Sequence, residues 1–250
     1  MATHDKPIPT KLKHDAIVEA LLEIRFDAAT IPEIFFGRLA DYGPWKGFRQ
    51  SHLPTYNIPA PLRQADKDLR YQPVFELKDV SGRRAVRIGG HVLSYHRTAP
   101  YVGWNAFEPE LHEAIEGLFA KTEGLMIRRL ELRYLNALRP DVHGIRSISD
   151  LDLTLAIAHE DLVDRVNINF QRDLFEDTRC TIRIATKEFV RGALPVDTSI
   201  FVDVAVSTKG VFQTTEGAKA KDWVHFAHKK EKEQFFRLLT DETIDALKEY

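Results

Sequence analysis

The chain has 250 residues, of which 44% are hydrophobic and 29% charged, and its formal net charge is −2. This is the mixture of a globular protein with enough apolar material for a core. The near-zero charge excludes a global field that would draw the protein onto nucleic acid or an anionic membrane, so a nucleic-acid site would have to be a local basic patch. The single cysteine, Cys180, excludes an intrachain disulfide framework and a thiolate metal cluster.

The start of the sequence is polar and lacks the apolar core of a signal peptide. No apolar run approaches the roughly 20 residues that a membrane-spanning helix needs. We therefore expect a cytoplasmic protein without a membrane partner. Residues 1–15 are predicted to form a flexible tail, residues 16–124 an N-terminal α+β half and residues 125–250 a C-terminal α+β half.

The first half opens with a strand, because apolar side chains alternate with mostly polar ones over residues 18–26. Thr30 and Glu33 have the spacing of a capping box, which predicts a short helix. Residues 44–70 contain several prolines and show no period, so we expect a long loop. The same half is predicted to hold strands near 71–79, 83–89 and 91–97, with turns at Ser81-Gly82 and Gly89-Gly90, and a helix near 105–121.

The second half opens with a strand over residues 127–138, in which charged and apolar side chains alternate. Residues 147–160 are ambiguous. Alternating leucines favour a strand there, but Ser147 ahead of Asp150 could cap a short helix, which we favour. The remaining predictions are strands near 163–171, 178–187 and 199–206, a charged helix near 216–239 and a last short helix after Thr240.

Both halves therefore have the order strand, short helix, three strands, longer helix. The stretch 22–26 also matches 130–134 locally, which together with the order favours an internal duplication. We predict an α+β fold with two antiparallel sheets, helices packed on one face of each, and one compact unit of pseudo-twofold symmetry. In element order this resembles the TATA-binding-protein-like or ferredoxin-like pseudodimers, which implies an arrangement and no function.

A second resemblance rests on stretches spread over nearly the whole chain: 16–20, 23–26, 101–104 with Phe107, 129–136, and Ala227-His228 with Phe235. Together they resemble a sporadically distributed family of uncharacterised prokaryotic proteins of this length. The resemblance implies no enzymatic activity, and the shared stretches contain no motif that identifies a reaction. Sporadic distribution is typical of accessory genes, including defence and toxin–antitoxin genes, so the resemblance implies a gene of that kind.

Two glutamate–arginine pairs stand out on the opening strands of the halves. Glu23 with Arg25, and Glu131 with Arg133, each lie two residues apart and therefore point the same way from a strand. They are either ordinary ion pairs of an exposed sheet face or part of a binding face for phosphates, carboxylates or a protein. The second reading adds the other arginines of predicted strands, Arg87, Arg128, Arg129 and Arg183.

Asn136 and Trp104 are candidate binding residues of a different kind. Asn136 is a polar member of an otherwise apolar strand face, so it is either a hydrogen-bonded core residue or the wall of a cavity between sheet and helix. Trp104 precedes a helix and could either seal the core or anchor a partner at the surface.

His228 and Glu231 are the candidate catalytic pair, because they share an apolar stripe of the last long helix. A carboxylate there could hold the imidazole for acid–base work, and the alternative is a buried structural histidine. His225 and His228 could share a metal ion, but the helix turns too far for a three-ligand site, and we predict no metal or other cofactor. Lys229, Lys230 and Lys232 are read as a solvated face.

The sequence carries no phosphate-binding loop, nucleophile elbow or zinc-protease pair. We therefore predict a non-enzymatic protein that binds a macromolecular partner, chiefly a protein, through the arginine-bearing face. The alternatives are a metal-independent enzyme acting on a phosphate-containing substrate such as RNA, and a small-molecule sensor with a pocket around Asn136.

Overall fold

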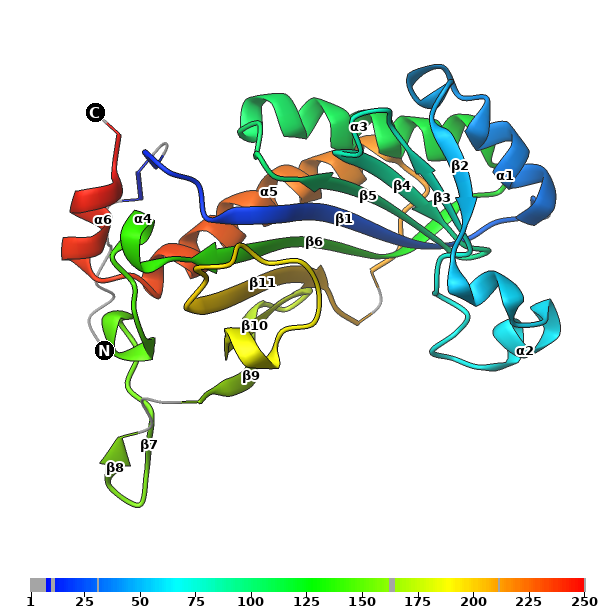
Figure 1. The fold of residues 1–250 in the computed structure, drawn as a ribbon. Coiled ribbons are helices and arrows are strands. Elements are labelled where there is room, and N and C mark those ends of the chain that lie inside the picture. Colours follow the sequence, from blue (N-terminus) through cyan, green and yellow to red (C-terminus); the bar gives the residue numbers. More distant parts are fainter. Residues whose placement is uncertain (1–7, 10–11, 31, 162–164, 211, 250) are drawn as a thin grey trace.

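The structure is a computed structural model that describes residues 8–9, 12–30, 32–161, 165–210 and 212–249. It is an α+β fold in which helices pack against a large antiparallel sheet, as the sequence predicts (Figure 1). In these ranges no helix is both long and apolar enough to cross a bilayer. The cytoplasmic location stays a prediction.

The strands follow the predicted order closely. They are β1 (Ile17–Asp27), β2 (Arg49–His52), β3 (Phe75–Lys78), β4 (Arg84–Ile88), β5 (Val92–Thr98), β6 (Met126–Leu138), β7 (Ala156–Ile157), β8 (Glu160–Asp161), β9 (Asn167–Phe175), β10 (Thr178–Thr186) and β11 (Ile200–Thr208). Among the described residues, nine of them form one sheet in the order β2-β3-β4-β5-β1-β6-β11-β10-β9, and β7 and β8 form a separate hairpin.

The expectation of two sheets is wrong, because the two halves share one. β1 and β6 pair side by side from Ile17 opposite Asn136 to Asp27 opposite Met126, which joins the halves at the centre of the sheet. The order outward from β1 (β5, β4, β3) matches the order outward from β6 (β11, β10, β9). An origin by internal duplication stays a prediction.

The helices are α1 (Pro32–Ala40), α2 (Ala60–Ala65), α3 (Trp104–Lys121), α4 (Pro140–His143), α5 (Gly217–Arg237) and α6 (Asp241–Leu247), with 3₁₀ turns at Gly43–Trp45, Pro54–Asn57, Ile148–Asp150 and Lys187–Phe189. α1, α3 and α5 lie on one face of the sheet, whereas α2 lies away from that face (Figure 1). α3 and α5 run next to each other across the sheet, and α5 packs on β6 and β11 (Figure 1). The alternating apolar residues of the strands and the apolar stripes of these two helices meet in a core that includes the fully buried Leu22, Leu132, Leu118 and Val224.

Two segments differ from their predictions. Residues 44–70 are no long loop, because they supply the edge strand β2 and the helix α2. Their prolines stand at the starts of short helical turns, where a missing N–H costs nothing. In residues 147–160, Ser147 and Asp150 do make a capping box, but the helix is a single 3₁₀ turn, and the strand β7 follows it.

The segment 1–15 is described only at residues 8, 9 and 12–15. Within it Leu12 is buried, whereas residues 8 and 13–15 are exposed, and the flexible tail over residues 1–15 stays a prediction. Leu12 is 8% exposed, and the Lys13 N–H donates to the Leu247 carbonyl at 2.8 Å. The N-terminal segment is thus fastened to α6. The side chain of Glu33, in the capping box predicted with Thr30, lies outside the described residues.

The turn between β4 and β5 has no room for a side chain at its first glycine. A Cβ on Gly89 would lie 2.5 Å from the Gln72 carbonyl oxygen and 2.7 Å from Val92 Cγ1, whereas one on Gly90 would meet nothing closer than 3.6 Å. We expect Gly89→Ala to lower the free energy of unfolding by about 1–3 kcal/mol, because it forces backbone to move. Gly90→Ala is the matched control and should stay within about 0.5 kcal/mol of wild type in urea denaturation. Equal effects of the two substitutions would contradict this account of the turn.

Candidate functional site

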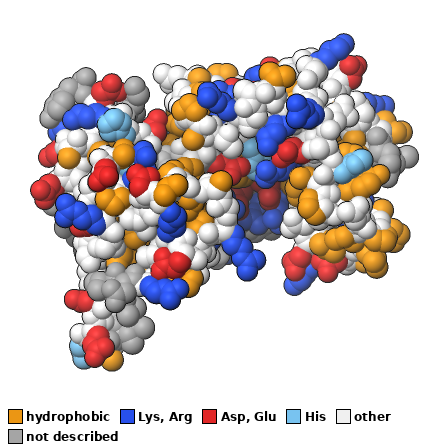
Figure 2. Space-filling model, in the orientation of Figure 1, with side chains coloured by type: hydrophobic (Ala, Val, Ile, Leu, Met, Phe, Trp, Pro, Cys, Tyr) orange, Lys and Arg blue, Asp and Glu red, His pale blue; other side chains and the backbone are white. Residues whose placement is uncertain are grey.

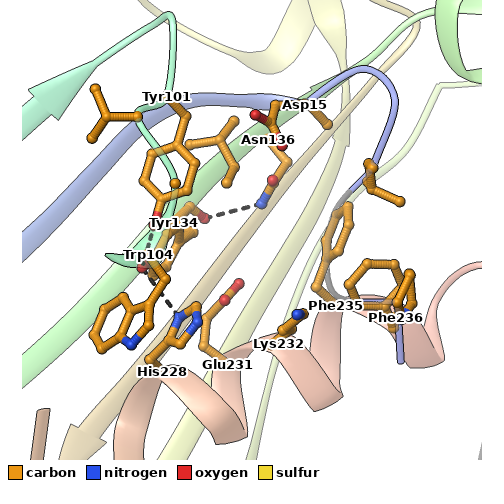
Figure 3. Close-up of a pocket in the computed structure, with 16 residues that line it drawn as sticks. Asp15, Tyr101, Trp104, Tyr134, Asn136, His228, Glu231, Lys232, Phe235 and Phe236 are labelled. Carbon is orange, nitrogen blue, oxygen red and sulfur yellow. Dashed lines mark hydrogen bonds between the residues drawn. The ribbon is translucent and has the colours of Figure 1, made fainter. Parts of the chain in front are cut away.

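A cavity of about 330 Å³ lies between the sheet and α5, where β1 begins and β6 ends. β6 contributes Tyr134 and Asn136 to its wall, and α5 contributes His228, Glu231, Lys232 and Phe235. Tyr101 and Trp104 line it from the start of α3, and Asp15 lines it from the N-terminal segment (Figure 3). Four sequence-selected residues, Trp104, Asn136, His228 and Glu231, therefore surround one cavity.

One wall of the cavity is a chain of aromatic hydrogen-bonding groups. The Tyr101 and Tyr134 hydroxyl oxygens are 3.2 Å apart, and the Tyr134 hydroxyl lies 3.3 Å from Nδ1 of His228 (Figure 3). The His228 ring stacks on the Trp104 indole, with centroids 3.8 Å apart and planes 8° apart. These contacts hold the imidazole in place on two sides.

This setting keeps His228 neutral. Burial lowers its pKa to about 3, and the nearby charges of Lys232 and His225 act in the same direction. A general acid or base works best when its pKa lies near the operating pH. His228 in this environment is therefore fitted to positioning and hydrogen bonding, and poorly fitted to proton transfer at neutral pH.

Glu231 is the unusual group of the cavity. The residue is 5% exposed, and Figure 3 shows its carboxyl pointing from α5 toward Tyr134 and Asn136. Among the described residues none forms a hydrogen bond or ion pair with this carboxyl. Burial raises its pKa to about 8, with Lys232 opposing the shift, so the acid is largely protonated at pH 7. An unpaired buried acid costs stability, which makes it a marker of function.

Asn136 combines both roles that its sequence position allows. Its side-chain Nδ2 donates to the carbonyl oxygens of Tyr134 at 3.4 Å and Val202 at 3.3 Å. Carbonyl oxygens only accept, so these partners fix which end of the amide faces the sheet. Oδ1 is left as an acceptor on a residue that lines the cavity.

The second candidate site is the face of the sheet opposite α3 and α5. Figure 2 shows a hollow there whose floor carries acidic and basic side chains. Glu23 and Arg25 of β1 lie on this face with Arg129, Glu131 and Arg133 of β6. Glu76 and Arg87 extend it toward one edge, and Asp203 and Arg183 toward the other.

The arginines of this face already have partners. Arg25 bonds Glu23 at 2.7 Å and Arg87 bonds Glu76 at 2.9 Å. Arg133 holds Asp203 with two hydrogen bonds, one of 2.8 Å. The pairs are completed by Arg128 with Asp27, Arg129 with Glu131, and Arg183 with Asn167 and the Phe189 carbonyl. The floor is thus a mosaic of ion pairs with little surplus positive charge, which suits a protein surface better than a phosphate backbone.

The centre of the floor places like charges opposite each other. Glu23 pairs in register with Glu131, and Arg25 with Arg129. Burial raises the pKa of Glu131, and the neighbouring Glu23 adds to that shift. Like charges directly opposite on a sheet are destabilising, whereas exchanging one glutamate–arginine pair would put opposite charges together. The observed pattern is therefore not the one that stability alone favours.

The sheet separates the two candidate sites. His228 and Glu231 lie on the helix side, and Arg25, Glu131 and Arg133 lie on the open side. Because the sheet lies between them, His228 and either Arg25 or Arg133 have no common site at which they could act on one substrate. His225 bonds Glu108 at 2.8 Å, so the two histidines of α5 have different partners. Cys180 is buried, and burial raises the pKa of its thiol to about 12.

Sequence reasoning missed several residues of these sites. Lys232 was read as part of a solvated face, yet it lines the cavity, as does Asp15. Asp203, 5% exposed, was not selected. Its signal was present, because it is the one acid in the apolar run 200–206, and a buried acid requires a partner such as Arg133.

No protein-family model matches this chain, and no curated protein matches its sequence. The resemblance to a sporadically distributed prokaryotic family therefore stays a prediction.

The raised pKa of Glu231 gives a pH-dependent stability. Its pKa rises from 4.5 to about 8 on folding, so between these values the folded state holds a proton that the unfolded state has lost. This contribution is fully present below pH 4.5 and is lost as the pH rises toward 8, by up to about 1.4 kcal/mol per pH unit. We expect Glu231→Gln to gain stability over wild type progressively between pH 5 and 8 in urea titrations.

His228, whose pKa is lowered by folding, makes stability rise with pH, which is the opposite of the Glu231 effect. Because His228 is present in both proteins, its contribution cancels when Glu231→Gln is compared with wild type. Glu233→Gln is the matched control, because Glu233 lies two residues away and bonds Lys230 at 2.7 Å. A stability difference between Glu231→Gln and wild type that does not change with pH would show that Glu231 ionises normally.

Proposed function

We propose that this chain is a non-enzymatic binding protein whose ligand is a small molecule held in the cavity between the sheet and α5. The observation that carries the proposal is the Glu231 carboxyl, buried, unpaired among the described residues and directed into a cavity of about 330 Å³. Ligand pockets of this type combine apolar and aromatic walls with a few convergent polar groups.

The walls support binding more than catalysis. Tyr101, Tyr134 and Trp104 offer aromatic surface, and Asn136 and Glu231 offer polar contacts. The hydroxyl oxygens and the His228 ring are held by each other, so the site is formed before a ligand arrives. Such preorganisation reduces the entropy cost of binding.

The tryptophans provide a selective test. The chain has three, and only Trp104 lines the cavity; Trp45 and Trp223 are buried in the core. In a fragment screen by ¹⁵N NMR, a compound bound in the cavity should shift the Trp104 indole N–H signal and leave the other two in place. Trp104→Phe assigns the signal. A bound compound should also raise the Tm, by an amount that grows with the logarithm of its concentration once that exceeds Kd. A screen in which no compound shifts the Trp104 signal would contradict the proposal that the cavity binds a small molecule.

A second function, recognition of a protein partner by the open sheet face, is favoured by the like-charge pattern at its centre. Glu23 lies opposite Glu131 and Arg25 opposite Arg129, although the exchanged order would pair opposite charges. Natural sequences depart from local optimality mainly at functional sites. A partner with a complementary alternation of charges would supply the missing attractions.

The double exchange Glu23→Arg with Arg25→Glu tests this face without a change in net charge. We expect its free energy of unfolding to stay within about 1 kcal/mol of wild type, because relief of the like-charge pairs offsets the lost contact of Arg25 with the Tyr71 ring. Partner capture from cells of the source organism, followed by mass spectrometry, should be lost.

The matched control exchanges Glu116 with Lys221, an ion pair between α3 and α5 on the helix side. It should capture the same partner as wild type. Capture that survives the exchange on β1 would remove the open face from partner recognition, and recovered nucleic acid in place of protein would contradict the choice of partner.

A further inference from the structure

Two acids and an amide oxygen are among the polar groups that line the cavity. Glu231 points into it, Asp15 stands on its wall, and Asn136 turns its donor end inward to two carbonyl oxygens and keeps Oδ1 as an acceptor. Among the described lining residues, Lys232 alone is a lysine or arginine, and Figure 3 shows its side chain extending toward Phe235. An anionic ligand would face two acids here.

The aromatic rings of the cavity wall, like its acids, favour a positively charged ligand. The Tyr101 and Tyr134 rings lie on the side of the cavity toward which Glu231 points, and His228 lies between Glu231 and Trp104 (Figure 3). Ring faces attract cations, and the attraction grows where water is excluded. A positive group in this space would therefore meet a carboxyl, an amide oxygen and aromatic rings together.

We infer that the cavity binds a small organic cation, a protonated amine carried on a compact apolar or aromatic body, with its ammonium group against Glu231 and the Asn136 Oδ1. The inference rests on the proposed function and adds the chemical class of the ligand. The ammonium supplies the hydrogen-bond donors that Glu231 lacks in the structure, and the apolar body packs against the aromatic rings and Phe235.

Binding of such a cation is coupled to proton release. The Glu231 carboxyl, with a pKa of about 8, is protonated in the empty cavity at pH 7 and loses its proton to the buffer when the ammonium arrives. The titratable and charged groups that face it are His228 and Lys232 on α5, Tyr134 on β6, Cys180 on β10, Tyr101 before α3 and Asp15 in the N-terminal segment. His228 stays neutral, and burial raises the pKa values of both tyrosines and of the cysteine, so none of these four changes charge between pH 6 and 8.

Three probes of the same size separate charge from shape: 2-phenylethylamine, the neutral 2-phenylethanol and the anionic phenylacetate. Each is titrated into the full chain while the Trp104 indole signal is followed by NMR, and the amine is also measured by calorimetry. We expect the amine to bind at least about tenfold more tightly than the alcohol and the anion to bind most weakly. Its Kd should fall by up to about tenfold per pH unit from pH 6 toward 8, with proton release to the buffer.

Glu231→Gln keeps the shape and hydrogen bonding of the side chain but cannot ionise. It should lose the preference for the amine and the pH dependence, while binding of the alcohol stays unchanged, and Glu233→Gln should behave as wild type. Equal affinity for amine and alcohol in wild type, unaltered by Glu231→Gln, would overturn the inference and leave the cavity as a binding site. Failure of all three probes to move the Trp104 signal would count against the inference, whereas the fragment screen decides the proposed function separately.

Discussion

The pairing of β1 with β6 is the constraint on which the rest of the structure depends. The two strands are long and central and pair from Ile17 to Asp27, with continuous register from Glu19 to Arg25, and each carries the outer strands of its own half. Because side chains alternate along a strand, this one pairing sorts the residues of both strands onto two faces at once. Leu22 and Leu132 are sent to the helix side, and Glu23 and Glu131 to the open side. Both candidate sites are consequences of that sorting.

The helix side shows how a cavity arises at the end of a core. Over most of the sheet, apolar residues of α3 and α5 fill the space against the strands. At the end of β6 the strand places Tyr134 and Asn136 at successive inward positions, and α5 places His228 and Glu231 above them. Tyr134 and His228 bond each other, whereas none of the described residues bonds the Glu231 carboxyl, which points into the cavity. Removing this acid from water costs free energy, which a ligand that donates hydrogen bonds would offset.

The open side of the sheet is polar instead of apolar. A sheet face that is left uncovered must be polar, and ion pairs along and across the strands satisfy that requirement. Here the arginines and acids neutralise one another, so the many strand-borne arginines do not make a basic patch. Counting arginines in the sequence overestimated the positive charge of the face, because cross-strand acids such as Asp203 come from distant parts of the chain.

Period-two patterns, helical patterns and capping residues are local properties, so the amino-acid sequence was enough to predict the class of fold and most of the strands and helices, although not β2, α2 or β7. It marked β1, β6, α3 and α5 closely, and it selected Trp104, Asn136, His228 and Glu231 from their unusual places in apolar patterns. It did not decide that the halves share one sheet, that the last helix brings Glu231 to the end of β6, or that the sheet divides His228 from Arg133. Those facts depend on strand pairing and on helix packing between residues about a hundred positions apart, and the pattern of either segment alone leaves the partner open.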